Sequence, residues 1–138
     1  MNKLFIDTNI VLDLLAKREE YASAAKVFSL GDTGKVKLFV SSLTFANTNY
    51  ILGRHLGKGP TIKVLRDLEL IVTIIDLSGK IVRLALNDDD FKDFEDGLQY
   101  YSALENEMDY IITRNLKDFK HSKIPVLTAD QYLKLPEK

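Results

Sequence analysis

The sequence contains no cysteine and only two histidines, His55 and His121. Without cysteine there is no disulfide framework, no thiolate zinc site and no cysteine nucleophile. Two histidines leave little material for a histidine-based metal site. No run of about 18 apolar residues is present, so no segment is predicted to span a membrane. The opening residues, MNKLFIDTN, have too short an apolar run and too early an acid for a secretory signal, and we expect a cytoplasmic protein.

The chain also lacks a strong excess of either charge, with 19 Lys and Arg against 20 Asp and Glu. A general polyanion-binding protein would be expected to carry a basic face, so that class is excluded. The charges are nevertheless sorted along the chain. Residues 53–66 contain no acid, whereas residues 88–96 contain six, with Lys92 as the only basic residue among them. The acidic cluster is either a solvated loop or a cation site beside an anionic ligand.

The 138 residues favour one domain, which we expect to span the whole of 1–138. Short apolar runs alternate with helical patterns, and no repeat or linker separates them. The runs predicted as strands are 4–6, 35–40, 70–75, 110–112 and 125–127. We expect helices over residues 20–30, 42–54, 81–86 and 94–107, with others near 10–15, after Pro60 and after Thr128. Gly31 is expected just past the end of the helix over residues 20–30. Because most of the strands are continuously apolar, they predict a parallel sheet covered on both faces, a three-layer α/β/α architecture.

Oxygen-bearing side chains follow the predicted strands. Asp7 follows the first strand, and Asn115 and Asp118 follow the fourth, while Asp93 and Asp96 open the helix before it. In parallel sheets, ligands bind beyond the carboxyl ends of the strands, where the strand order reverses. Oxygen-only donors suit Mg²⁺ or Mn²⁺, and two such ions can clamp a phosphodiester. The pattern therefore favours a hydrolytic metal site.

Each of these residues also has a plain structural interpretation. Asp7 can cap the helix that follows it. Asp93 and Asp96 lie at a helix start, where carboxylates are favoured by the helix dipole. Asn115 can be a turn residue and Asp118 a surface residue. Asn47 occupies one place in an apolar stripe of its helix, so it is either hydrogen-bonded in the core or directed at a site; the stripe comprises Leu43, Ala46, Tyr50 and Ile51.

Four segments, taken together, resemble the PIN-domain family of ribonucleases, which includes the toxins of VapC-type toxin–antitoxin pairs. The segments are residues 5–9 (FIDTN), 40–44 (VSSLT), 93–98 with Ala103 (DFEDGL) and 109–119 (DYIITRNLKDF). The resemblance covers nearly the whole chain and implies a five-stranded parallel sheet of order 3-2-1-4-5. The first and fourth strands would then be neighbours, which would bring Asp7 to the turn at Asn115–Asp118.

The resemblance also implies roles for individual residues. Asp7 and Asp96 match metal-binding acids of the family, Asn115 falls at a further ligand position, and Asp118 lies in the same turn and can substitute for it. Asn47 stands where the family usually has Glu, a departure typical of one subgroup. In that subgroup Asp93 or Glu95 would supply the missing carboxylate. The substrate contacts expected are Asn47, Thr8, Asn9, Arg114, Arg54 and Lys58, the basic ones guiding an RNA backbone.

The implied function is an Mg²⁺- or Mn²⁺-dependent endoribonuclease, with RNA as substrate and a small, separate antitoxin as partner. Asp7→Asn is then expected to abolish cleavage while leaving the metal-free protein as stable or more stable. A homodimer is a further expectation, through helices near Tyr50–Leu56 and Ile62–Leu65. The alternative is a PIN-like module that binds RNA or a protein without cutting. A receiver-type phosphoacceptor domain is a weaker interpretation, because Asp7 is followed by Thr8 and Asn9 rather than by a second acid.

Overall fold

The computed structural model describes residues 1–136 and contains one parallel five-stranded sheet of order β3-β2-β1-β4-β5. This is the predicted order. The strands are β1 (Lys3–Ile6), β2 (Lys37–Ser41), β3 (Thr73–Ile75), β4 (Tyr110–Ile112) and β5 (Val126–Leu127). The central strand β1 pairs with β2 on one side and β4 on the other, so that Phe5 lies opposite both Phe39 and Ile111. The strand order therefore reverses between β1 and β4.

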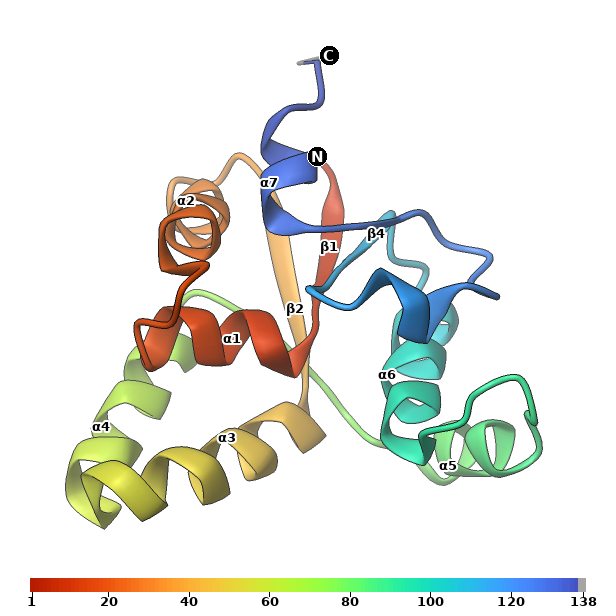
Figure 1. The fold of residues 1–138 in the computed structure, drawn as a ribbon, viewed down its shortest axis with the longest axis horizontal. Coiled ribbons are helices and arrows are strands. Elements are labelled where there is room, and N and C mark those ends of the chain that lie inside the picture. Colours follow the sequence, from red (N-terminus) through yellow and green to blue (C-terminus); the bar gives the residue numbers. More distant parts are fainter. Residues whose placement is uncertain (137–138) are drawn as a thin grey trace.

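Helices cover both faces of the sheet (Figure 1). They are α1 (Thr8–Leu15), α2 (Tyr21–Asp32), α3 (Ser42–Leu56), α4 (Lys58–Glu69), α5 (Gly79–Leu86), α6 (Phe94–Glu105) and α7 (Ala129–Leu133), with a 3₁₀ helix, η1, at Leu116–Phe119. Leu4 and Ile6 of β1 pack in one core with α1, α2, α4 and α7, whereas Phe5 packs in another with α6. Because successive residues of β1 are buried on opposite faces, the three-layer prediction is confirmed.

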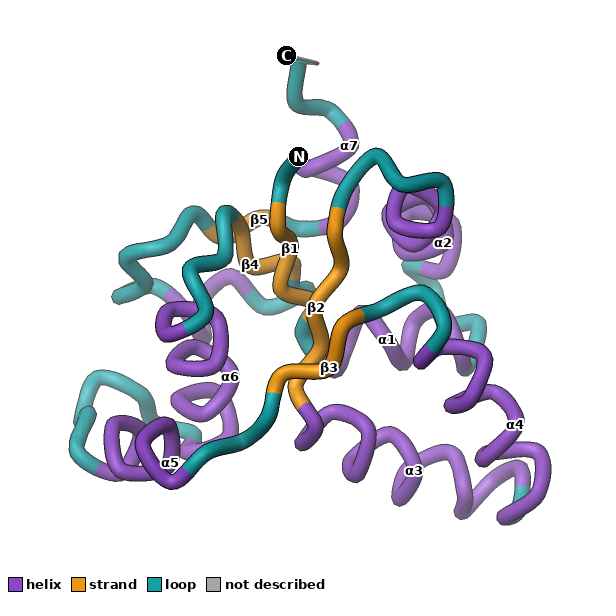
Figure 2. The backbone as a smooth tube through the Cα atoms, turned by 180° about the vertical axis from the view of Figure 1, so that it is seen from behind, coloured by secondary structure: helices purple, strands orange, loops and turns teal. Residues whose placement is uncertain are grey.

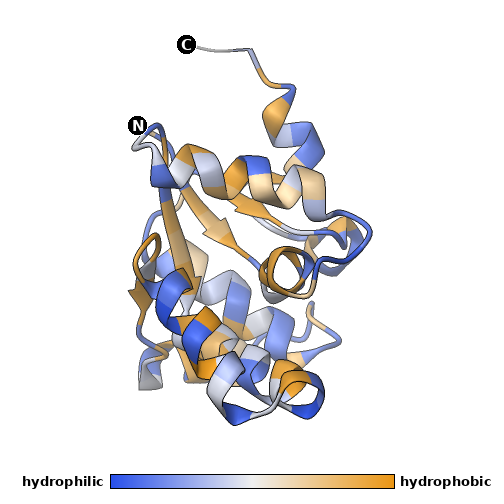
Figure 3. Ribbon diagram, turned by 90° about the vertical axis from the view of Figure 1, so that its left-hand side faces the viewer, coloured by the Kyte–Doolittle hydropathy of each residue, from blue (hydrophilic) through white to orange (hydrophobic). Residues whose placement is uncertain are grey.

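The carboxyl end of the sheet is surrounded by helices. Figure 2 shows α3 and α4 lying side by side beyond one side of the sheet and α5 beside α6 beyond the other. The strands are predominantly hydrophobic, whereas the helices alternate hydrophilic and hydrophobic residues (Figure 3). Such amphipathic helices pack one face on the core. None of the helices within residues 1–136 is long and apolar enough to cross a membrane.

The predicted end of α2 is wrong by two residues. Gly31 lies inside the helix, which continues to Asp32, and Gly34 adopts the left-handed conformation instead, with φ of 77°. A Cβ atom at Gly31 would lie 2.3 Å from Cδ1 of Leu38, which is buried in β2. The glycine is therefore needed for close packing of α2 on the sheet rather than for a helix end.

The predicted buried strand over residues 70–75 is also wrong in length and burial. Only Thr73–Ile75 form β3, since α4 continues to Glu69. Leu70 is 80% exposed, and Ile74 is exposed on a strand that pairs with β2 alone. Apolar character alone does not distinguish an edge strand, or the segment that leads into it, from a central strand.

The remaining helix boundaries agree more closely with the predictions. Side chains cap the helices as expected at Asp7, Ser41 and Thr128, the last within a complete capping box. Ser41 rather than Ser42 caps α3, and Ser42 instead accepts a hydrogen bond from the Leu77 amide. The helix expected to reach residue 107 ends at Glu105.

Candidate functional site

A cleft of about 390 Å³ opens at the carboxyl ends of β1 and β4. We call it the carboxylate cleft. It is lined by Asp7, Thr8, Asn9, Leu12, Leu43, Asn47, Tyr50, Ile51, Glu95, Asp96, Gln99, Asn115 and Asp118. The cleft therefore brings together seven of the predicted site residues from four separate segments of the chain. Among the predicted residues, Asp93, Arg114, Arg54 and Lys58 do not line it.

The carboxylate of Asp7 is buried, 6% exposed, and accepts hydrogen bonds on both oxygens. Oδ1 accepts from the Thr8 amide at 2.8 Å and from Nε2 of Gln99 at 3.1 Å. Oδ2 accepts from the Thr113 hydroxyl at 2.8 Å and from Nδ2 of Asn9 at 3.2 Å. Asp7 thus caps α1, as the structural interpretation predicts, and it also lines the cleft, while its binding of a metal stays a prediction. Burial raises its pKa, the hydrogen bonds oppose that rise, and the charge of Asp118 adds to it.

Three polar residues around Asp7 were not predicted from the sequence: Gln99, Thr44 and Thr113. Gln99 is 3% exposed, and its Nε2 also contacts the hydroxyls of Thr44 at 3.0 Å and Thr8 at 3.3 Å. Its Oε1 has no hydrogen-bond partner among the described residues. The available signal was position, because Gln99 follows Asp96 by three residues and so shares its face of α6.

The acids of the cleft repel one another. The pKa of Asp96 is raised to about 7, first by burial and then by the charges of Asp118, Asp93, Asp7 and Glu95. Asp93 caps α6 by accepting a hydrogen bond from the Glu95 amide at 2.8 Å, which fixes the first turn beside the cleft. A cation between these side chains would relieve the repulsion.

The donor set fits a hard divalent cation in kind and charge. Carboxylate oxygens of Asp7, Asp96 and Asp118, with the amide oxygen of Asn115, are ligands that suit Mg²⁺ or Mn²⁺ rather than zinc. Within residues 1–136, no three histidine, aspartate or glutamate side chains are already grouped closely enough to hold an ion. The cleft therefore supplies ligands and charge without a closed metal cage.

Asn47 faces the cleft rather than the core. The buried side of α3 is formed by Thr44, Thr48 and Leu52, whereas Ala46 and Tyr50 of the predicted apolar stripe are exposed. The interpretation of Asn47 as a hydrogen-bonded core residue is therefore wrong, although Leu43 of the stripe packs against a core cluster. Nδ2 of Asn47 donates to Oε1 of Glu95 at 3.4 Å, which places an amide on α3 opposite a carboxylate on α6.

The sequence matches a family model described as the PIN domain over residues 3–117. This chain belongs to the PIN domain family. Ribonuclease VapC1 of Aquifex aeolicus is 28% identical over 94% of this chain and 92% of its own length. Two solved structures share the fold of this PIN domain. One is a toxin–antitoxin complex from Klebsiella pneumoniae, with a TM-score of 0.69 and 22% identity over 91% of this chain and 97% of the other. Another is VapBC-1 from nontypeable Haemophilus influenzae, with a TM-score of 0.70 and 16% identity over 93% of this chain and 98% of the other.

The basic residues predicted to guide RNA lie outside the cleft of this PIN domain. The guanidinium of Arg114 lies 3.1 Å from Oδ1 of Asp13, whose side chain is fully buried, and its backbone amide donates to Oδ1 of Asn9. Arg54 lies over the ring of Tyr50, 5.6 Å from its centroid. Lys58 begins α4 and is exposed. Arg114 is therefore committed to a structural ion pair, and Arg54 is the one that adjoins the cleft.

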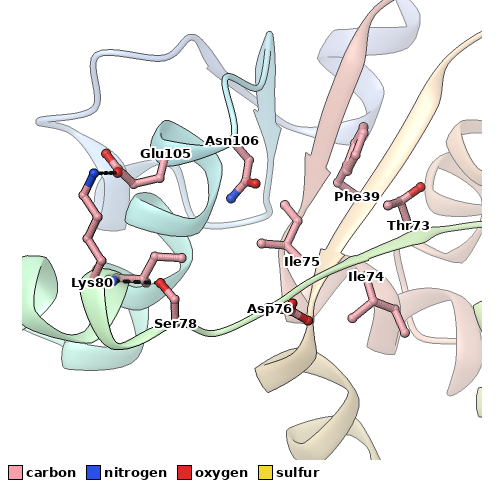
Figure 4. A pocket seen from close by; sticks show the side chains of 10 residues that line it. Phe39, Thr73, Ile74, Ile75, Asp76, Ser78, Lys80, Glu105 and Asn106 are labelled. Atoms are coloured by element: carbon pink, nitrogen blue, oxygen red, sulfur yellow. Dashed lines mark hydrogen bonds and ion pairs between the residues drawn. The ribbon is translucent and has the colours of Figure 1, made fainter.

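A second hollow of the PIN domain, about 400 Å³, lies beside β3 on the sheet face that Phe39 occupies (Figure 4). Its acids are Asp76 and Glu105, which lie on opposite sides of the hollow, and Glu105 is paired with Lys80 at 2.6 Å. Because its acidic side chains do not converge, we assign the candidate active site to the carboxylate cleft.

Proposed function

We propose that this PIN domain is an endoribonuclease dependent on Mg²⁺ or Mn²⁺, and the toxin of a toxin–antitoxin pair. The observation that carries the proposal is the convergence of Asp7, Asp96 and Asp118 at the point where the strand order reverses. The similar protein from Aquifex aeolicus is named a ribonuclease, and the similar structure from Klebsiella pneumoniae is a toxin–antitoxin complex.

The proposed metal ligands are Asp7, Asp96, Asp118 and Asn115. A bound divalent ion lowers the pKa of its water and polarises a phosphoryl oxygen, which supplies both a nucleophile and charge stabilisation. The chain itself gives a reason for requiring a cation. A phosphodiester would meet the charges of up to five carboxylates in or beside the cleft, and it cannot approach them without neutralisation.

The protein's own groups hold the reacting parts in place. The four hydrogen bonds on Asp7 fix the orientation of its carboxylate. Asn9 links Asp7 to the backbone of Arg114, and so joins the β1 and β4 sides of the cleft. We assign to Glu95, assisted by Asp93, the carboxylate role that Asn47 lacks, because Glu95 lines the cleft and contacts Asn47.

The proposed partners are RNA, a separate antitoxin protein and a second copy of the chain. Of the expected dimer surfaces, Tyr50 and Leu56 on α3 are exposed, whereas Leu65 on α4 is buried. The homodimer proposal therefore keeps only the surface around Leu56, and it leaves out Tyr50, which lines the cleft.

A second candidate function is a PIN module that binds RNA without cutting it. Two observations favour it: position 47 carries an amide where the family usually has an acid, and the described acids do not form a ready metal cage. The two functions differ in whether RNA is broken when a divalent ion is supplied.

The test is cleavage of a labelled single-stranded RNA with Mn²⁺, with Mg²⁺ and with a chelator. We expect the parent protein to cut only with a metal, and Asp96→Asn to lose about 100-fold or more in rate because a ligand charge is removed. Asp67→Asn, at an exposed position of α4, is the matched control and should keep full activity. RNA binding without metal-dependent cleavage by the parent would favour the binding module instead.

A further inference from the structure

An aromatic ring stands at the mouth of the carboxylate cleft. Tyr50 of α3 is 66% exposed and yet lines the cleft. On the same helix, Leu43 and Ile51 also line it, and Leu12 extends this lining from α1. The cleft therefore has an apolar, aromatic wall on α3 and α1, while α6 contributes the carboxylates of Glu95 and Asp96.

The surroundings of Tyr50 are basic. Arg54, one helical turn further on, places its guanidinium 5.6 Å from the ring centroid. Arg54 and His55 close the last turn of α3, Lys58 opens α4, and all three are exposed. No acid occurs between residues 51 and 66. A single exposed aromatic residue is ordinary. Tyr50, however, lines the carboxylate cleft and lies next to basic residues, so a ligand could stack on its ring and place a phosphate beside Arg54.

We infer that Tyr50 is a base-stacking platform for an unpaired nucleotide of single-stranded RNA, with Arg54 beside it to contact the backbone. Bases stack on aromatic side chains regardless of sequence, because every base has a π face. Duplex RNA keeps its bases stacked internally and offers no free face. The inference rests on the proposed function and deepens it, since it assigns a residue outside the carboxylates to substrate binding.

The charge distribution supports RNA over an apolar peptide as occupant. The α3 end contributes positive charge next to the ring, whereas the catalytic side of the cleft is negative. A nucleotide stacked on Tyr50 would have its phosphate within reach of the basic residues, and Asp7, Asp96 and Asp118 of the same cleft would hold the cation that neutralises their charge. An apolar peptide would gain nothing from Arg54, His55 and Lys58.

The test measures binding of a fluorescein-labelled single-stranded RNA in the Asp96→Asn background with Mg²⁺, where the RNA persists. Tyr50→Ala should weaken binding about tenfold or more, the usual effect of removing one stacking ring. Tyr50→Phe keeps the ring and should bind within about twofold of the background. Tyr21→Ala, at an exposed tyrosine of α2 outside the cleft, is the control for loss of an aromatic surface. Circular-dichroism melting curves establish that each variant is folded.

Because the chain contains no tryptophan, Tyr50→Trp creates a single fluorescent reporter at the platform. We expect its emission to be quenched by single-stranded RNA and much less by a duplex of the same sequence or an abasic strand. Tyr21→Trp should not respond.

The outcomes separate the inference from the function on which it rests. Equal RNA affinity of Tyr50→Ala and the background, with metal-dependent cleavage by the parent intact, would overturn the platform and leave the nuclease standing. Trp fluorescence that responds to a protein partner but not to RNA would overturn the platform in favour of a protein-binding wall. Absence of both RNA binding and RNA cleavage would overturn the two proposals together.

Discussion

The four hydrogen bonds on Asp7 use the lone-pair directions that a carboxylate has available. An incoming cation must therefore share an oxygen or displace a donor. The longest of the four bonds, at 3.2 Å, comes from Nδ2 of Asn9, which also contacts the Thr113 hydroxyl at 3.3 Å. Asn9 can therefore release Asp7 and retain a partner, which makes it the donor most easily displaced.

Asp96 should make the metal-free protein less stable as the pH rises. Its pKa is raised to about 7 in the folded state, above the value of 3.8 for an unperturbed Asp, so folding binds a proton between these values. The stabilisation is complete below about pH 4 and is lost as the pH rises through about 7. We predict that Asp96→Asn raises Tm at pH 8 but not at pH 4, measured by thermal melting with chelator. Equal pH dependence of the two proteins would contradict the raised pKa.

Gln99 should stabilise the carboxylate of Asp7. Gln99→Leu removes one of the two donors to Oδ1 from a buried position, so we predict a loss of about 1–3 kcal/mol in the free energy of unfolding. Gln99→Glu provides a matched comparison. At pH 8 it should lower the free energy of unfolding more than Gln99→Leu does, because the carboxylates of positions 7 and 99 repel each other. At pH 5 it should lower the free energy of unfolding less, because the new carboxyl group can donate a hydrogen bond to Asp7. Urea denaturation at both pH values measures the difference, and no change with pH would argue against direct contact with Asp7.

At the scale of elements, the turn between β4 and η1 is the part of the cleft with the least regular structure. Three contacts tie it down: the Arg114 guanidinium to Asp13, the Arg114 amide to Asn9 and the Asn115 amide to the Thr113 hydroxyl. The first of these fixes the turn to the last turn of α1. The Arg114–Asp13 ion pair, which lies outside the cleft, therefore helps to position Asn115 and Asp118.

Breaking that ion pair should destabilise the protein. Arg114→Ala leaves the buried carboxylate of Asp13 without its cationic partner, while its second oxygen already has no hydrogen-bond partner within residues 1–136. We predict a loss of about 2–4 kcal/mol in the free energy of unfolding. This is less than the cost of breaking a fully buried ion pair, because the guanidinium is partly exposed. Adding Asp13→Asn to Arg114→Ala should recover part of the loss by removing the unpaired charge. Urea denaturation tests both, and a single variant as stable as the parent would show that the pair does not hold the turn.

At the scale of the whole molecule, much of the architecture is predictable because hydrophobic periodicity reports burial on both faces of the sheet. The alternation of short apolar runs with helical patterns yields the strands and the layers, and the strand order followed from the family resemblance. The polar ring around Asp7 was not predictable in the same way. Gln99, Thr44 and Thr113 are buried polar residues, and no periodic pattern distinguishes them from surface positions.

Two other misreadings share a physical cause. The stripe through Tyr50 has helical spacing, but an apolar face that lines a cleft has the same spacing as one that packs in a core. Residues 70–72 are apolar, yet they connect α4 to an edge strand, and Leu70 is exposed. Periodicity indicates which residues share a face, whereas the neighbouring element decides whether that face is covered.

Divalent cations should stabilise the folded molecule as a whole, because the ligands come together only in the fold. We predict that Mn²⁺ at about 100 times its dissociation constant raises the free energy of unfolding by about 2.7 kcal/mol. This corresponds to a rise in Tm of several degrees for a chain of this length. The rise should be larger at pH 8 than at pH 6, since a protonated Asp96 binds cations poorly. Asp96→Asn should abolish most of the shift, and Asp67→Asn should not. A shift of equal size in all three proteins would indicate non-specific binding.

Asp7 and Asp118 are separated by more than a hundred residues in sequence, and β4 must dock beside β1 before the two share a cleft. The first three quarters of the sequence contain β1, β2 and β3, and therefore Asp7, but neither β4 nor the turn that carries Asn115 and Asp118. A chain folded only through β3 would have Asp7 without the residues that face it from the β4 side, so we expect the cleft to assemble only when β4 pairs with β1.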